Sequence, residues 1–161
     1  MKKMLVIVAM LAATMSYGQK KATVSYNAGV QVNAPMGALS NDFNYGIGGL
    51  VSANCQPGKK VTYSLTAGYL SYQAKASGTN VSQVPVLVGA SYPVYKAINL
   101  GAEAGVSFFN NSIGNRITVG GVVSHNISSK FNVAVRYTST LKNSTDVDPI
   151  SNGSFTVSYR F

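Results

Sequence analysis

The chain has 161 residues and a formal net charge of +9 at pH 7, yet only 11% of its residues are charged. This length suits one domain rather than two, and the charged fraction is less than half of the ~25% typical of soluble domains. Beyond residue 19, no segment is long and apolar enough to predict a membrane helix. Two classes remain: a soluble β protein with a weakly charged surface, or a membrane β-barrel.

The first predicted element is an export signal. A basic start precedes an apolar run over residues 4–15, and the small residues Ser16 and Gly18 follow it. That order is typical of a secretory signal peptide, and the run is shorter than the roughly 20 residues that a transmembrane helix needs. We therefore predict a cleaved signal peptide over residues 1–18 and one barrel domain over residues 19–161. Because an exported chain rarely meets nucleic acid, we predict no nucleic-acid binding despite the basic charge.

Eight strands are predicted after the signal peptide. From Ala22 onward, apolar residues recur at every second position, which is the period of a β-strand. The predicted strands cover residues 22–34, 43–55, 61–72, 84–92, 98–109, 116–127, 131–141 and 151–161. Pro85 does not suit the fourth strand, because proline removes a hydrogen bond from the ladder. We expect a bulge or a late strand start there.

Short turns and longer loops alternate between these strands. The short turns cover residues 56–60, 93–97 and 128–130, and the longer loops cover residues 35–42, 73–80, 110–115 and 142–150. Short turns at one rim and longer loops at the other are typical of outer-membrane barrels, whose short turns are periplasmic. This alternation predicts that both ends of the mature chain lie on the periplasmic side.

Alternation alone does not say which face is inside, since a lipocalin-like barrel of eight strands keeps its apolar face inward. The centre of the polar face carries only Glu103, Arg136 and Arg160 as charges, whereas a soluble surface is ~25–35% charged. The aromatic residues of the apolar face fall into two bands around an aliphatic belt. One band holds Phe43, Tyr45, Tyr69, Phe108, Tyr137 and Phe155, and the other holds Tyr26, Tyr63, Tyr92, Phe131, Tyr159 and Phe161. Because aromatic rings favour membrane–water interfaces, we predict that the apolar face meets lipid.

The final strand has a recognisable pattern. Its in-phase residues are Phe155, Val157, Tyr159 and Phe161. This pattern resembles the terminal strand of bacterial outer-membrane β-barrels, which the barrel-assembly machinery reads during biogenesis.

Further motifs extend the resemblance over the mature chain. Residues 33–39 (Asn-Ala-Pro-Met-Gly-Ala-Leu), followed by Phe43, by residues 46–48 (Gly-Ile-Gly) and later by residues 68–69 (Gly-Tyr), resemble barrels described as porin-family proteins. The chain resembles the small outer-membrane β-barrel family that includes the OmpX-like proteins and the OmpA-like transmembrane domain. The resemblance implies an all-β, eight-stranded antiparallel up-and-down transmembrane β-barrel in a Gram-negative-type outer membrane. It implies no peptidoglycan-binding domain.

Two charged residues are predicted to meet inside the barrel. Glu103 lies five residues beyond Ile98, and Arg136 lies five residues beyond Phe131, on strands that run in the same direction. The two side chains should therefore face each other at similar depth. An eight-stranded barrel has an interior just wide enough for side chains to fill. We predict a structural ion pair in a side-chain-filled lumen, and the alternative is an ion-selective constriction.

The sequence provides no catalytic constellation, although some eight-stranded relatives modify lipid A. His125 falls on the outward face, whereas Glu103 points inward, and Asp42, Asp146 and Asp148 lie at the opposite rim. Nucleophilic hydrolysis needs a histidine within hydrogen-bond reach of its partners. We therefore predict no enzyme activity, no cofactor and no transition-metal site.

Two functional hypotheses remain, with a narrow ion-conducting pore as a third. The first is a structural or accessory barrel, possibly beside a larger outer-membrane complex, because Ala102, Ala104 and Gly121 would allow another protein to approach closely. The second is an adhesin-like surface binder acting through its short outer loops. Basic residues at the periplasmic rim would hold anionic lipid headgroups or serve as general anchors. They are Lys20, Lys21, Lys59, Lys60, Lys96, Lys130 and Arg160.

Overall fold

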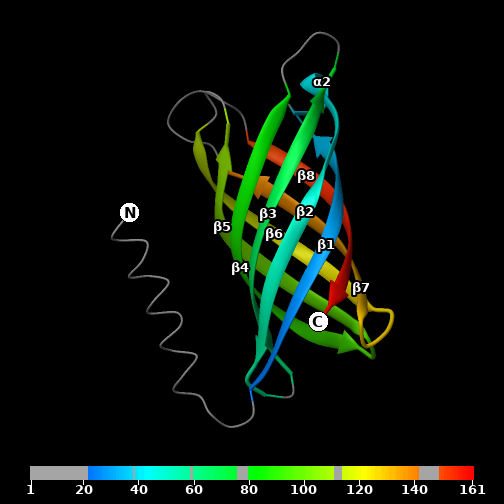
Figure 1. Ribbon diagram of the computed structural model, residues 1–161. Coiled ribbons are helices and arrows are strands. Elements are labelled where there is room, and N and C mark those ends of the chain that lie inside the picture. The colour runs from blue at the N-terminus through cyan, green and yellow to red at the C-terminus, as the bar shows by residue number, and fades with distance from the viewer. Residues whose placement is uncertain (1–21, 38, 59, 76–79, 111–113, 142–148) are drawn as a thin grey trace.

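The computed structural model describes residues 22–37, 39–58, 60–75, 80–110, 114–141 and 149–161. Within these ranges eight antiparallel strands close into one barrel, in which each strand pairs with its neighbours along the chain and β1 pairs with β8 (Figure 1). The strands are β1 (Thr23–Met36), β2 (Phe43–Gln56), β3 (Thr62–Ala74), β4 (Val81–Tyr95), β5 (Ile98–Phe109), β6 (Asn115–Asn126), β7 (Phe131–Thr140) and β8 (Ile150–Arg160). A short helix, α2 (Leu39–Asp42), lies between β1 and β2. The predicted eight-stranded antiparallel barrel is confirmed, while the predicted signal peptide over residues 1–18 lies outside the described residues.

The barrel has two unlike ends. β1 begins and β8 ends at the lower end in Figure 1, which we call the termini end, and the opposite end is the loop end. At the termini end only Lys96 and Ala97 connect β4 to β5. The turn between β6 and β7 is closed by Ser128, whose Oγ accepts hydrogen bonds from the backbone N–H groups of Lys130 (3.2 Å) and Phe131 (3.0 Å). The predicted short turns thus lie at the termini end.

Side chains alternate between the lumen and the outer surface, as the pleat of a strand requires. The outward-facing Val30 is 64% exposed, whereas the inward-facing Thr156 is 2% exposed. Val51 and Val135 are likewise exposed on the outside. The apolar face therefore points outward, as predicted, and the polar face lines the lumen.

Most of the predicted girdle residues lie on the outer surface. Those that are exposed are Tyr26, Tyr45, Tyr63, Tyr69, Tyr92, Phe131, Tyr137, Phe155 and Phe161. Phe108 and Tyr159 are half-buried.

Phe43 is an exception, and its predicted place in the outer girdle is wrong. The β2–β3 register passes from Phe43–Ala74 to Tyr45–Gln73, so β2 has one more residue than β3 over this stretch. Such a bulge reverses the direction of the side chains on one side of it. Phe43 consequently points into the lumen and is only 8% exposed, with its ring edge-on to that of Tyr72 at 6.2 Å between ring centres.

Pro85 also departs from expectation. β4 begins at Val81, well before the proline, and the β3–β4 pairs on the two sides of it, Ala67–Val86 and Leu70–Gln83, share one register. There is thus neither a late strand start nor a bulge at Pro85. Between those two pairs, the residues of β3 and β4 are not paired with each other. This gap agrees with the N–H group that proline lacks.

Candidate functional site: the barrel lumen

The lumen of the loop half is closed by an apolar cluster, which we call the apolar cap. Its buried members are Phe43, Leu70, Tyr72, Ala74, Val81, Phe109 and Ile150. They come from β2, β3, β4, β5 and β8, so the cap extends across the barrel. Burial of these side chains away from both lipid and water stabilises the closed loop end.

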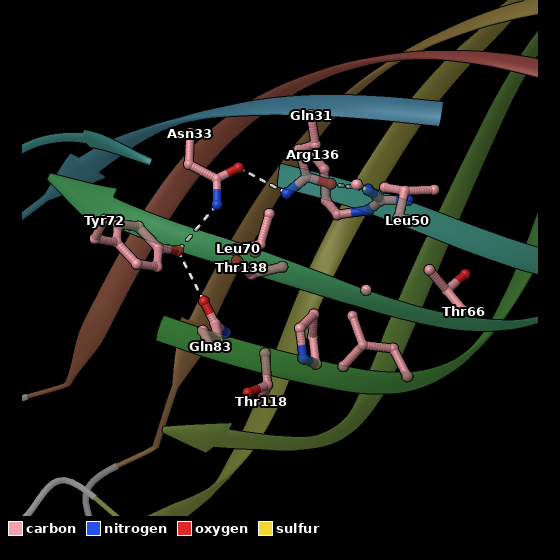
Figure 2. A pocket seen from close by; sticks show the side chains of 14 residues that line it. Gln31, Asn33, Leu50, Thr66, Leu70, Tyr72, Gln83, Thr118, Arg136 and Thr138 are labelled. Carbon is pink, nitrogen blue, oxygen red and sulfur yellow. Dashed lines mark hydrogen bonds between the residues drawn. The ribbon is translucent and has the colours of Figure 1, made fainter. Parts of the chain in front are cut away.

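Beneath the apolar cap, buried polar side chains form a continuous hydrogen-bonded layer, and Figure 2 shows its bonds from Asn33 through Tyr72 to Gln83. Asn33 Nδ2 donates to the hydroxyl oxygen of Tyr72 (2.9 Å), and that hydroxyl donates to Gln83 Oε1 (2.7 Å). Gln83 Nε2 donates to Ser107 Oγ (2.8 Å), and Thr118 Oγ1 donates to the same oxygen (2.7 Å). We call these residues, with Gln31, the polar layer; they connect β1 to β6 through the lumen.

Tyr72 joins the two layers, because its ring belongs to the apolar cap and its hydroxyl to the polar layer. Tyr72 is not among the residues predicted from the sequence. The available signal was its phase: Thr62, Thr66 and Leu70 share its side of β3 and point inward. An aromatic residue in an otherwise mostly small and polar phase indicates a lumen-filling side chain.

The predicted pair, Glu103 and Arg136, is in contact below the polar layer. Glu103 Oε1 lies 2.7 Å from Arg136 Nε, and the two side chains are 4% and 12% exposed. Arg136 Nη1 also donates to Gln31 Oε1 (3.0 Å), and Gln31 Nε2 donates to Asn33 Oδ1 (2.6 Å). The ion pair is therefore continuous with the polar layer.

Two glycines lie beside Glu103 in the strand ladders. In the strand ladders Glu103 lies directly opposite Gly89 of β4 and Gly120 of β6. A Cβ added at Gly120 would lie 2.5 Å from the backbone oxygen of Tyr137 and 2.8 Å from Cγ2 of Thr138. A Cβ added at Gly89 would lie 3.3 Å from Cβ of Glu103, so the missing side chain at Gly89 leaves room for Glu103, whereas Gly120 lets β6 pack closely against β7.

The termini half of the lumen is hollow. A cavity of about 390 Å³ extends from the ion pair to the rim, where Thr23, Gln56 and Lys60 line it. The expected side-chain-filled lumen is therefore wrong for this half, although the loop half is filled. The wall of the hollow half is rich in side chains that are too short to meet across the barrel. They include Ser25, Asn27, Ser52, Ser64, Ser91, Ser124, Asn132 and Ser158.

A second, much smaller cavity lies inside the filled half. Its volume is about 20 Å³, and Gln31, Tyr72 and Gln83 are among the residues that line it. This volume accommodates about one water molecule, which needs polar partners such as these.

The predicted outer-surface residues are arranged as follows. His125 is exposed on β6, opposite Ile98 of β5, and so lies outside the lumen that holds Glu103. Ala102 and Gly121 are exposed and lie directly opposite each other in the β5–β6 ladder, with Ala104 exposed on the same face. Asp146 and Asp148 lie outside the described residues. Among the residues that the structure describes, no group of three or more His, Cys, Asp or Glu side chains is placed to hold a metal ion.

Tyr159 and Phe161, at the end of the chain, form an aromatic cluster with Phe131 at the termini end. The Tyr159 ring packs edge-on against Phe131 at 5.4 Å and against Phe161 at 5.1 Å between ring centres. Lys130 Nζ lies 6.0 Å from the centre of the Tyr159 ring. Lys60, Lys96 and Arg160 lie at this end as well, whereas Lys20, Lys21 and Lys59 are outside the described ranges.

Several solved structures share this fold. Neisserial surface protein A is 16% identical, with a TM-score of 0.59, and the match covers 88% of this chain and 98% of that one. The N-terminal β-barrel domain of Pseudomonas aeruginosa OprF is 11% identical, with a TM-score of 0.62 and coverage of 88% and 100%. Ail, the attachment invasion locus protein of Yersinia pestis, is 12% identical, with a TM-score of 0.57 and coverage of 86% and 97%. At these identities the likeness is one of fold.

No protein-family model and no curated protein sequence matches the chain. Within the described ranges, no helix combines the length and the hydropathy needed to cross a lipid bilayer.

Proposed function

We propose that the chain is a small integral β-barrel of a Gram-negative-type outer membrane, with its termini end in the periplasm and a structural or accessory role. The observation that carries this proposal is the exposed aliphatic belt between aromatic side chains, which surrounds a polar lumen. Lipid favours such a belt, and the interfaces favour the rings. In water the same surface would be an apolar patch far larger than soluble monomers expose. The fold shared with Neisserial surface protein A, OprF and Ail supports the same assignment.

Cysteine labelling of a chain produced in a Gram-negative host tests location and orientation together. In a Cys55→Ser background, a single cysteine replaces Lys75 at the loop end or Ser129 in the β6–β7 turn. A membrane-impermeant maleimide should label K75C on intact cells and S129C only after the outer membrane is permeabilised. The reversed pattern would reject the orientation, and recovery of the chain in the soluble periplasmic fraction would reject the membrane assignment.

The accessory role is supported by the small exposed residues Ala102, Ala104 and Gly121. Small side chains let the backbone of another membrane protein approach closely. Purification in mild detergent should recover a stoichiometric membrane partner with the original chain and lose it with Gly121→Leu. Ala28→Leu, on the outer surface of β1, is the matched control and should retain the partner. Equal recovery with all three chains would reject this patch as the contact.

Surface binding is the alternative function. Lys75 Nζ donates to the backbone oxygen of Ser40 (2.7 Å), which ties the β3–β4 connection to the β1–β2 connection and orders one part of the loop end. Ail is named for attachment and invasion. Exchange of the loop-end connections for those of an unrelated barrel should abolish cell-surface binding if this function holds, and leave the binding of a membrane partner intact.

Catalysis is not part of the proposal, and neither is a cofactor. His125 lies on the outer surface and Glu103 in the lumen, on opposite sides of the barrel wall. A histidine must reach its partner within about 3 Å to act as a general base. A purified, folded chain should therefore leave lipid A and phospholipid unchanged, as judged by mass spectrometry.

A further inference from the structure

The structural role proposed above does not use the cavity in the termini half of the lumen. Its volume of about 390 Å³ lies within the range of roughly 300–1,000 Å³ typical of small-molecule sites. The Glu103–Arg136 ion pair closes its inner end, and Thr23, Gln56 and Lys60 lie at its rim. The cavity thus reaches the rim at the termini end, where a solute can enter it.

The charge inside the cavity is positive. The charged side chains that line it are Lys60, Glu103, Arg136 and Arg160. Glu103 neutralises Arg136 at 2.7 Å, and neither Arg160 nor Lys60 has an ion-pair partner within the described part of the chain. A concave site with low-dielectric walls concentrates the field of such charges and attracts anions.

Arg160 is oriented by a hydrogen bond and has a buried donor without a partner among the described residues. Its Nη2 donates to Asn126 Oδ1 (3.0 Å), an oxygen that also accepts from Asn132 Nδ2 (3.0 Å). Its Nε is buried and has no hydrogen-bond partner among the described residues. A fixed guanidinium with an unused N–H suits an oxyanion, because charge-assisted hydrogen bonds are about twice as strong as neutral ones.

An unused acceptor is available in the same wall. Asn27 lies directly opposite Arg160 in the β1–β8 ladder, and both residues line the cavity. Asn27 Oδ1 is buried and, like Arg160 Nε, has no partner in the described ranges. Leaving a buried polar atom unsatisfied costs about 1–3 kcal/mol, so a ligand that carries a donor is favoured here.

We propose that this cavity binds a small, hydroxylated phosphate monoester that enters from the termini end. Arg160 holds a phosphate oxygen through Nε, Lys60 contributes long-range attraction at the rim, and Asn27 Oδ1 accepts a hydrogen bond from a ligand hydroxyl group. The proposed function places the termini end in the periplasm, so the ligand would be a periplasmic solute. Only this source of the ligand rests on the proposed function, because the site itself is formed within one barrel.

The test uses the full mature chain folded in a neutral detergent without phospholipid, so that no lipid headgroup can supply the phosphate. Glycerol 3-phosphate, inorganic phosphate and glycerol are titrated in turn, and binding is measured from the amide chemical shifts of residues that line the cavity. We expect glycerol 3-phosphate to bind more tightly than inorganic phosphate, and glycerol to cause no shifts. Absence of phosphate-dependent shifts would mean that the cavity holds water only, and would overturn the proposal.

Three variants assign the contacts. Arg160→Gln should weaken phosphate binding about tenfold, which corresponds to about 1.4 kcal/mol. Asn27→Ala should remove the preference for glycerol 3-phosphate over inorganic phosphate. Lys96→Gln removes a lysine at the same end that does not line the cavity, and it should bind like the original chain. If Lys96→Gln and Arg160→Gln weakened phosphate binding equally, the attraction would come from the general charge of this end, and the proposed site would be rejected.

Arg160→Lys provides a second readout if Arg160→Gln does not fold. It keeps the positive charge but cannot reproduce the Nε and Nη2 geometry. We expect Arg160→Lys to bind phosphate less tightly than the original chain does. It should bind phosphate more tightly than the double variant Lys60→Gln Arg160→Lys, which also lacks the lysine at the rim. Undiminished affinity in Arg160→Lys and in Lys60→Gln alike would overturn the assigned contacts. Because these measurements need no outer membrane, they can fail while the membrane proposal stands.

Discussion

Glu103 and Arg136 belong to β5 and β7, which are separated by β6, yet Glu103 Oε1 lies 2.7 Å from Arg136 Nε. Gly120 of β6 lies directly opposite Glu103 and packs closely against Tyr137 and Thr138 of β7. Arg136 also connects the ion pair to the polar layer, because its Nη1 donates a hydrogen bond to Gln31. One ion pair thus links strands that do not otherwise pair, and it marks the boundary between the filled and the hollow halves of the lumen.

Removing one partner of this ion pair should destabilise the barrel. Glu103→Ala leaves the Arg136 guanidinium buried without its carboxylate, which costs about 3–5 kcal/mol in comparable cases. Urea unfolding of the barrel in lipid vesicles measures the change in the free energy of unfolding. The double variant Glu103→Met Arg136→Met is the control and should recover most of the loss, because it removes both charges at similar volume. Equal destabilisation by the single and double variants would contradict this account.

Ion conductance should stay absent when the ion pair alone is broken. The polar layer and the apolar cap still close the lumen between Glu103 and the loop end. In planar bilayers neither the original chain nor Glu103→Ala should give discrete conductance steps. Stable steps in Glu103→Ala would show that the ion pair is the only gate, and would favour the pore alternative.

Substitution by alanine should destabilise the barrel at Gly120 and have little effect at Gly121. A Cβ at Gly120 meets backbone at 2.5 Å, whereas the nearest atom to a Cβ at Gly121 is 3.9 Å away. Gly120→Ala should therefore cost about 1–3 kcal/mol, as overpacking does, and Gly121→Ala should be close to neutral. The same urea titration compares the two variants, and a similar effect at both positions would contradict the close packing of Gly120 against β7.

The bulge in β2 predicts opposite environments for Phe43 and Tyr45. The chain contains no tryptophan, so Phe43→Trp and Tyr45→Trp each introduce a single fluorophore. Lipids carrying bromine quench tryptophan that touches them. They should quench the tryptophan at position 45 strongly and the one at position 43 weakly, with Val30→Trp as the lipid-facing reference. Strong quenching at position 43 would show that this position faces the lipid, and would contradict the inward orientation of Phe43.

Much of the barrel follows from local pattern. Alternation predicts which way Val30, Val51 and Val135 point, because successive side chains of a strand lie on opposite faces. Counting residues from the start of each strand also brings Glu103 and Arg136 to similar depth. The types of residue at the inward-facing positions do not, however, reveal how far these side chains reach across the lumen.

The remaining features depend on registers between strands that are distant in sequence. The extra residue in β2 turns Phe43 inward, and no alternation within β2 reveals it, since only the pairing with β3 defines the bulge. Tyr72 reaches Asn33 and Gln83 because closure of the sheet brings β1, β3 and β4 around one narrow lumen. The sequence by itself determined the barrel, its outward apolar face and the depth of its central charges. Only the tertiary structure decided which half of the lumen is filled, because that depends on side-chain volumes summed across all eight strands at each depth.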